Sequence, residues 1–209
     1  MISFFITIFI LTIFEYKLIK TLNPGSRNYV ISLHNDYRSQ LTQGQSVNLS
    51  GGYMPNAKNI KQMSYSINLE NIAQKWADNC TYSHSGTQYG ECFSAFSNEY
   101  SETTGLFNAI SGWWSELVYK GVVGPEGDNT WIPFTGDQYA RGIGHWSQMA
   151  WWNTIQVGCA ITRCNPYRTY VVCNYDPIGN VITLGVYEIG TPCSGCPNNC
   201  NSTNKLCLN

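Results

Sequence analysis

Two segments in the carboxyl-terminal half of the chain constrain its fold most strongly. Residues 144–153 read G-H-W-S-Q-M-A-W-W-N, so a histidine follows a glycine turn and precedes a short aromatic-rich helix. Residues 173–180 read C-N-Y-D-P-I-G-N, so a cysteine on a strand leads into a Pro/Gly turn. Both segments contain rare residue types, namely Trp, His and Cys. Two such segments in this order are very unlikely to occur by chance, so together they are a specific indicator of the fold.

Elsewhere the sequence predicts helices first and strands later. Apolar residues recur at helical spacing over residues 28–43, 68–79 and 103–119. Segments rich in β-branched and aromatic residues, bounded by turn residues, follow at 157–162, 169–175 and 181–188. This order indicates an α+β domain built from layers of secondary structure.

The amino terminus bears on the cellular compartment. Residues 2–14 are apolar apart from Ser and Thr, and Glu15 and Lys17 end the run. A membrane span needs about 20 residues, whereas the apolar part of a secretory signal needs about 7–15. We therefore predict a signal peptide over residues 1–24 and a secreted, extracellular protein with no membrane span in the mature chain. An uncleaved anchor is the alternative, because no basic residue precedes the run and no clear cleavage site follows it.

Charge and cysteine content narrow the classes of partner. Charged residues make up 12% of the 209 residues and the net charge is −1, with no basic or acidic run. This argues against electrostatic capture of nucleic acid or of an anionic membrane. Nine cysteines agree with an oxidising compartment. Glycosylation sequons occur at Asn48, Asn79 and Asn201, and Asn79 is the least certain of them because a cysteine follows it.

The segments at 144–153 and 173–180 resemble the two signature segments of the CAP superfamily. This superfamily comprises cysteine-rich secretory proteins, antigen 5 of insect venoms with related venom-allergen-like proteins, and plant pathogenesis-related proteins. The resemblance implies a three-layer α-β-α sandwich with an antiparallel central sheet over residues 28–189. It also implies a short Cys-rich, hinge-like extension over residues 190–209. The scaffold serves several purposes in its family, so the fold alone does not assign an activity.

Spacing alone cannot choose among the many possible disulfide connectivities, but the resemblance implies one. The implied pairs are Cys80–Cys164, Cys159–Cys173, Cys193–Cys200 and Cys196–Cys207. Cys92 is left over, at the position where the family usually has the Asn of a G-E-N motif. A small buried thiol is the favoured interpretation of Cys92; an intermolecular disulfide in a weak dimer, a metal ligand and a reactive thiol are the alternatives.

The resemblance further implies a site made of two histidines and two glutamates. His84, Glu91, Glu116 and His145 match four family positions that face one another across a cleft. Two neutral imidazoles suit Zn²⁺ or another divalent cation, and neighbouring carboxylates fix their tautomers. Two protein nitrogens with water make a weak, open site, so His84 and His145 are the expected metal ligands. The alternative is a hydrogen-bonded cluster that only orders loops.

Three functions are compatible with this sequence. The leading hypothesis is a secreted monomer or weak dimer that acts by binding an extracellular protein or a lipid or sterol, and an enzyme is the less favoured class. The alternative is a metal-assisted hydrolase or protease, with Glu91 or Glu116 as the base and a His-bound water as the nucleophile. Ser147 is a weak nucleophile candidate, because neither G-x-S-x-G nor H-E-x-x-H occurs. A structural role without a ligand is the third.

Two further features of the sequence bear on function. His34 lies on the buried side of the first predicted helix, and we expect it to be a packed core residue. Residues 121–142 form a long Gly-rich and aromatic loop, and long loops are usually functional or mobile. In some relatives a loop of this kind lines a sterol- or fatty-acid-binding groove.

Overall fold

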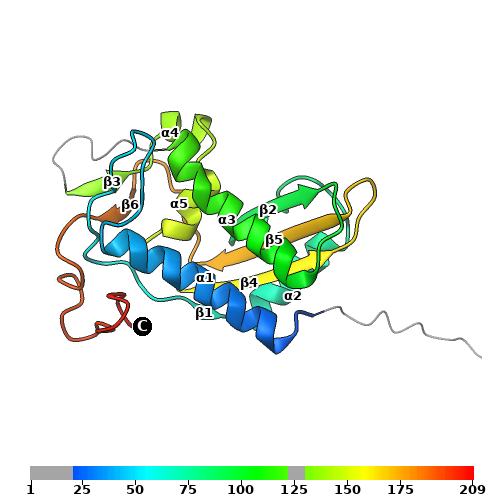
Figure 1. The fold of residues 1–209 in the computed structure, drawn as a ribbon, viewed down its shortest axis with the longest axis horizontal. Coiled ribbons are helices and arrows are strands. Elements are labelled where there is room, and N and C mark those ends of the chain that lie inside the picture. Colours follow the sequence, from blue (N-terminus) through cyan, green and yellow to red (C-terminus); the bar gives the residue numbers. More distant parts are fainter. Residues whose placement is uncertain (1–20, 122–129) are drawn as a thin grey trace, which may run out of the picture.

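The structure, a computed structural model shown in Figure 1, describes residues 21–121 and 130–209. The predicted signal peptide therefore lies outside the described residues except for its last few positions. Three of those positions, Leu22, Asn23 and Pro24, belong to the folded domain, because Pro24 is the first residue of the first helix. Leu22 is buried in the core, and the side chain of Asn23 accepts a hydrogen bond from the backbone of Ser26, which caps the first helix.

The described residues form five helices and six strands. The helices are α1 (Pro24–Thr42), α2 (Ile67–Ala77), α3 (Glu102–Lys120), α4 (Gly136–Ala140) and α5 (Gly144–Ala150). The strands are β1 (Ser64–Tyr65), β2 (Gly90–Phe96), β3 (Trp131–Pro133), β4 (Gln156–Thr162), β5 (Thr169–Asp176) and β6 (Gly185–Glu188). In these residues no helix combines the length and the apolar character that a membrane crossing requires.

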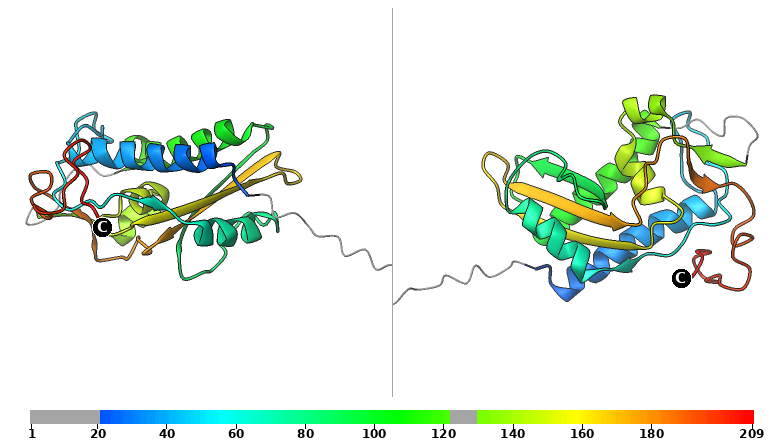
Figure 2. Two further views of the ribbon diagram at one scale, coloured as in Figure 1. Left: turned by 90° about the horizontal axis from the view of Figure 1, so that it is seen from below. Right: turned by 180° about the vertical axis from the view of Figure 1, so that it is seen from behind.

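The predicted α+β sandwich is confirmed, with α1 and α3 over one face of the central sheet and α2 over the other (Figure 2). The sheet has the strand order β1-β4-β5-β2. It is antiparallel at β4–β5 and β5–β2, but the short β1 runs parallel to β4, so the expectation of a wholly antiparallel sheet needs this correction. The strand expected at 181–188 is shorter, and it pairs with β3 in a separate two-stranded sheet.

Close contact between α2 and β4 depends on one glycine. A Cβ atom at Gly158 would lie 2.2 Å from the backbone nitrogen of Glu70 and 2.4 Å from the carbonyl oxygen of Ser66. Any side chain at this position would therefore push the helix off the sheet. The other side of the sheet packs against a larger apolar core that includes Trp113, Trp146 and many aliphatic residues.

A buried guanidinium ties α1 to the first signature segment. Arg38 is fully buried, and among the described residues it donates hydrogen bonds to backbone carbonyl oxygens, those of Lys61, Met149, Trp151, Trp152 and Thr154. Burial lowers the pKa of Arg38 to about 9, so the side chain still carries its charge at neutral pH. Because charge-assisted hydrogen bonds are stronger than neutral ones, this residue fixes the chain that leaves α5.

Four disulfides staple the domain, in the same pairs that the resemblance implies: Cys80–Cys164, Cys159–Cys173, Cys193–Cys200 and Cys196–Cys207. A disulfide typically stabilises a fold by about 2–4 kcal/mol. The Cys-rich segment after Gly190 packs on the sandwich, because Leu206 is buried in the core and Cys207 exchanges backbone hydrogen bonds with Ile60 and Gln62. Cys92 is free and buried, so it cannot reach a thiol of another chain in this fold.

Candidate functional site

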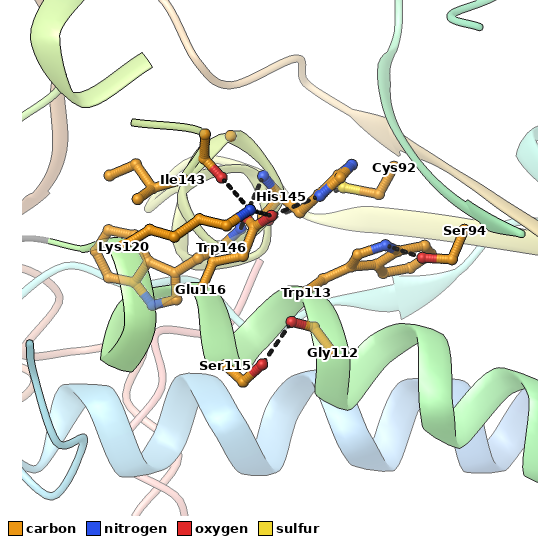
Figure 3. A network of polar contacts seen from close by, with 12 residues as sticks. Cys92, Ser94, Gly112, Trp113, Ser115, Glu116, Lys120, Ile143, His145 and Trp146 are labelled. Carbon is orange, nitrogen blue, oxygen red and sulfur yellow. Dashed lines mark hydrogen bonds and ion pairs between the residues drawn. The ribbon is translucent and has the colours of Figure 1, made fainter. Parts of the chain in front are cut away.

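One carboxylate organises the first signature segment (Figure 3). Glu116 Oε1 lies 2.9 Å from Nδ1 of His145. Glu116 Oε2 accepts hydrogen bonds from the backbone N–H groups of His145 (3.0 Å) and Trp146 (3.1 Å). These N–H groups belong to the first turn of α5, whose N-cap Ile143 supplies no side-chain acceptor. A side chain from α3 thus replaces the missing local cap of α5.

The carboxylate of Glu116 is ionised in this environment. Its side chain is 9% exposed, and Lys120, one turn later on α3, lies 3.4 Å from it. Burial on its own would raise the pKa of Glu116, but the hydrogen bonds from His145 and Trp146 and the charge of Lys120 outweigh it and leave the pKa below its usual value. An ionised carboxylate only accepts, so Nδ1 of His145 carries the hydrogen and Nε2 of the neutral ring keeps its lone pair.

A second histidine–carboxylate pair, His84 and Glu91, joins the end of a loop to β2. Nδ1 of His84 lies 3.0 Å from Oε1 of Glu91, whose side chain is 5% exposed. Glu91 also accepts hydrogen bonds from the backbone and hydroxyl of Ser85 and from the amide of Asn174. Burial opposes ionisation of Glu91, yet the hydrogen bonds from His84 and Ser85 hold its pKa below its usual value. His84 therefore also keeps an Nε2 lone pair when neutral, on a side chain that is 64% exposed.

The four predicted residues lie in two pairs, with the ring of Phe93 next to both histidines. The ring centroid of Phe93 lies 4.8 Å from that of His84 and 6.4 Å from that of His145. Within residues 21–121 and 130–209, no three or more His, Cys, Asp or Glu side chains are grouped so that they could hold a metal ion. The site therefore offers at most two imidazole ligands, which is compatible only with weak metal binding.

A polar cavity of about 250 Å³ opens beside the second pair. Its lining includes His84, Ser85, Glu91, Gln148 and Asn180, but neither member of the Glu116 pair. The resemblance implies a cleft that all four residues face. In the structure, this cavity is lined by His84 and Glu91 but not by Glu116 or His145. Hydroxyl, amide, imidazole and carboxylate groups face this cavity, so it suits a small polar ligand or a polar group of a larger one.

The structure does not support Ser147 as a catalytic nucleophile. Ser147 is fully buried, and its hydroxyl donates to Asn180 at 2.6 Å and contacts the carbonyl oxygen of Ile143 at 3.0 Å. The hydroxyl therefore joins α5 to the Pro/Gly turn after β5 instead of meeting an imidazole. A serine nucleophile needs a base within hydrogen-bond reach, and none is placed there.

His34 is a packed core residue, as its helical position indicates. Its Nδ1 lies 2.8 Å from the carbonyl oxygen of Val30 and its Nε2 lies 3.0 Å from the hydroxyl of Tyr175. Because a carbonyl can only accept, Nδ1 is the donor and Nε2 accepts from the tyrosine. Burial lowers the pKa of His34 to about 4, so the ring is neutral and has no free nitrogen for a ligand.

Comparison with known proteins gives the same family that the two signature segments indicate. The model of the CAP family, described as the cysteine-rich secretory protein family, matches residues 31–175. This chain belongs to the CAP family. Relatives in the family include the Ancylostoma secreted protein of Ancylostoma caninum, 32% identical over 89% of this chain and 45% of that protein. The chain thus spans about half the length of that relative.

Two further CAP proteins are matched by this chain over a larger share of their own length. Cysteine-rich secretory protein 2 of Homo sapiens is 31% identical over 86% of this chain and 68% of that protein. The crystal structure of NaASP2 with Zn²⁺ superimposes with a TM-score of 0.83 at 32% identity, covering 90% of this chain and 97% of that one. The CAP sandwich of this chain is therefore supported by sequence and by structure.

Proposed function

We propose that this CAP protein acts outside the cell by binding, and that His84 and His145 hold a divalent cation weakly. The observation that carries the proposal is shared by both histidines. In each, Nδ1 is tied to a buried, ionised carboxylate at 2.9 or 3.0 Å, and Nε2 has no hydrogen-bond partner among the described residues. Carboxylate–histidine–metal arrangements use this geometry to orient the ring and raise its basicity.

The donor set fits Zn²⁺ or a similar ion only as a loosely held ligand. His84 and His145 would be the protein ligands, and Glu91 and Glu116 would orient them. A structural zinc normally has four protein ligands, so the remaining positions here belong to water or to a ligand. When bound, such an ion would supply a positive charge that a carboxylate, phosphate or carbonyl oxygen of a ligand can coordinate. The match with NaASP2, whose structure contains Zn²⁺, supports this assignment.

An extracellular location is supported by the chemistry of the fold. Disulfides persist in oxidising compartments, and four of them link eight of the nine cysteines. The names of similar proteins, among them a secreted protein of Ancylostoma and venom allergen 5 of Tityus serrulatus, agree with export. We therefore place the protein among secreted binding proteins.

The hydrolase alternative is less well supported by the site. A general base works best when its pKa lies near the working pH, but Glu91 and Glu116 both have pKa values below the usual carboxylate value. Both carboxylates are also saturated with hydrogen bonds. Hydrolysis of peptides or esters by pure protein, abolished in a folded His145→Ala variant, would overturn the binding proposal in favour of an enzyme.

An apolar hollow offers a place for the lipid or sterol ligand that the family resemblance suggests. This hollow of about 400 Å³ is lined by Trp131, Pro133, Trp152 and Leu184, with Thr183 and Gly185. Leu184 is 54% exposed, and the rings of Trp131 and Trp152 meet edge to face. Part of the long loop expected to line such a groove, residues 122–129, lies outside the described residues. Titration with a fluorescent sterol, compared between wild type and Trp152→Ala, tests this ligand class.

Calorimetric titration with Zn²⁺ tests the cation proposal. We expect heat of binding with a dissociation constant between micromolar and millimolar for wild-type protein, as two imidazoles and water allow. The double variant His84→Ala/His145→Ala should give no heat above dilution, whereas Glu99→Gln, which changes an exposed carboxylate that pairs with Arg163 and Arg168, should bind as wild type. A flat wild-type titration at neutral pH would remove the cation proposal.

A further inference from the structure

Three cysteines lie side by side on three adjacent strands. In the register of the sheet, Cys92 of β2 is directly opposite Cys173 of β5, and Cys173 is directly opposite Cys159 of β4. Residues directly opposite in a sheet project their side chains from the same face. The Cys159–Cys173 disulfide therefore has a free thiol beside it, in the same row and on the same side of the sheet.

The order of the strands suits thiol–disulfide exchange. A thiolate displaces one sulfur of a disulfide by attacking the other, so the attacking, central and leaving sulfurs have to be arranged in that order. The strand order β2-β5-β4 puts Cys173 in the middle, with Cys92 and Cys159 on either side. Directly opposite residues of antiparallel strands have Cα atoms about 4.5–5.5 Å apart, within the roughly 4.4–6.8 Å that a disulfide spans.

We propose that Cys92 exchanges with the Cys159–Cys173 disulfide, giving a second native form with a Cys92–Cys173 bond. In this step the sulfur of Cys92 bonds to the sulfur of Cys173, the bond between Cys159 and Cys173 breaks, and Cys159 leaves as a thiolate. The proton lost by Cys92 ends on Cys159. The number of disulfides is unchanged, so the step needs no oxidant or reductant.

The exchange moves a cross-link onto the strand that carries the site. In the first form the disulfide joins β4 to β5; in the second it joins β5 to β2, one residue from Glu91 and one from Phe93. Formation of the second bond also removes the thiol that lies 3.9 Å from the carbonyl oxygen of His145. The two forms therefore differ next to both His–Glu pairs.

Two matched variants test the register argument. In Cys159→Ala, Cys92 and Cys173 remain as neighbours. When this variant is produced in an oxidising secretory compartment, which supplies the oxidant, we expect them to form a disulfide and to leave no free thiol after denaturation without reductant. In Cys173→Ala, Cys92 and Cys159 remain two strands apart, about 9–10 Å, and both should react with an alkylating reagent. Two free thiols, or a disulfide-linked dimer, in Cys159→Ala would overturn the proposal.

A wild-type experiment keeps the proposal testable if a variant fails to fold. Native protein is incubated at about pH 9 without added thiol or reductant, quenched in acid, unfolded, alkylated and mapped by peptide mass spectrometry. We expect the alkyl label on both Cys92 and Cys159, in place of Cys92 alone before incubation. In Cys92→Ala treated in parallel, Cys159 should stay unlabelled. A label confined to Cys92 in the treated wild type would contradict the exchange.

Discussion

Glu116 and His145 are joined twice, once through the imidazole and once through the backbone. One carboxylate oxygen accepts from the ring at 2.9 Å, and the other accepts from the N–H of the same residue at 3.0 Å. The same side chain therefore fixes the ring tautomer and caps the helix that carries the ring. Loss of Glu116 should affect stability and cation binding together, whereas loss of the imidazole should affect mainly binding.

The first prediction concerns the cap that α3 supplies to α5. Glu116→Ala leaves the N–H groups of His145 and Trp146 without their charged acceptor, and an unsatisfied buried polar group costs about 1–3 kcal/mol. We expect the free energy of unfolding, measured in urea, to fall by about that amount, with a smaller loss in Glu116→Gln, whose amide oxygen can still accept. Glu99→Ala is the exposed control and should be near neutral. Equal stabilities of Glu116→Ala and wild type would refute the capping role.

The second prediction concerns His34 and acid stability. Its folded-state pKa is about 4 and its ordinary value is 6.5, so the unfolded chain binds more protons between these values. The stability that neutral His34 contributes is fully present above about pH 6.5 and is lost as the pH falls to about 4, a change of roughly 3 kcal/mol. In His34→Gln we expect lower stability at pH 7 but a flatter slope across this window in urea unfolding. Parallel slopes for the two proteins would contradict the assignment.

The third prediction reverses the order expected for the glycosylation sequons. Asn48 is 4% exposed, and its amide nitrogen lies 3.4 Å from the carbonyl oxygen of Tyr53. The amide nitrogen of Asn201 donates to Gln62 at 3.1 Å, whereas Asn79 is exposed. A glycan on either of the first two would displace these contacts. We therefore expect glycan only at Asn79 in protein secreted from eukaryotic cells.

Gel mobility before and after glycosidase treatment tests this prediction. Asn79→Gln should remove the whole shift, and Asn48→Gln and Asn201→Gln should leave it unchanged. A shift that survives in Asn79→Gln would show that one of the other two asparagines is modified.

The sequence predicts the main helices and two of the central strands well, because their periodicity and turn residues are local. It misses β2 (Gly90–Phe96), the strand that carries Glu91, Cys92 and Phe93. That strand is half-buried and mostly small or polar, and it is fixed by pairing with β5 along its whole length. The helix predicted from residue 28 also begins too late, since α1 starts at Pro24. Its first turn, from Pro24 to Arg27, is determined by the cap at Asn23 and not by apolar spacing.

The identity of the site residues follows from the family resemblance, but their arrangement does not. No local pattern indicates that Glu116 caps a helix 29 residues away. Nor does any pattern show that Phe93 lies next to both histidines, or that the polar cavity is lined by only one of the two pairs. These relationships depend on tertiary packing between α3, α5 and β2, which spacing along the chain does not encode.

Histidine ¹⁵N NMR during addition of Zn²⁺ tests the central claim most directly, because it reads each imidazole nitrogen separately. Before addition we predict that neutral His84 and His145 both carry hydrogen on Nδ1, with Nε2 unprotonated. Zn²⁺ should then shift the Nε2 signals of these two residues and leave His34, buried and paired with Val30 and Tyr175, unchanged. Unshifted Nε2 signals of His84 and His145 up to millimolar Zn²⁺ would contradict the account.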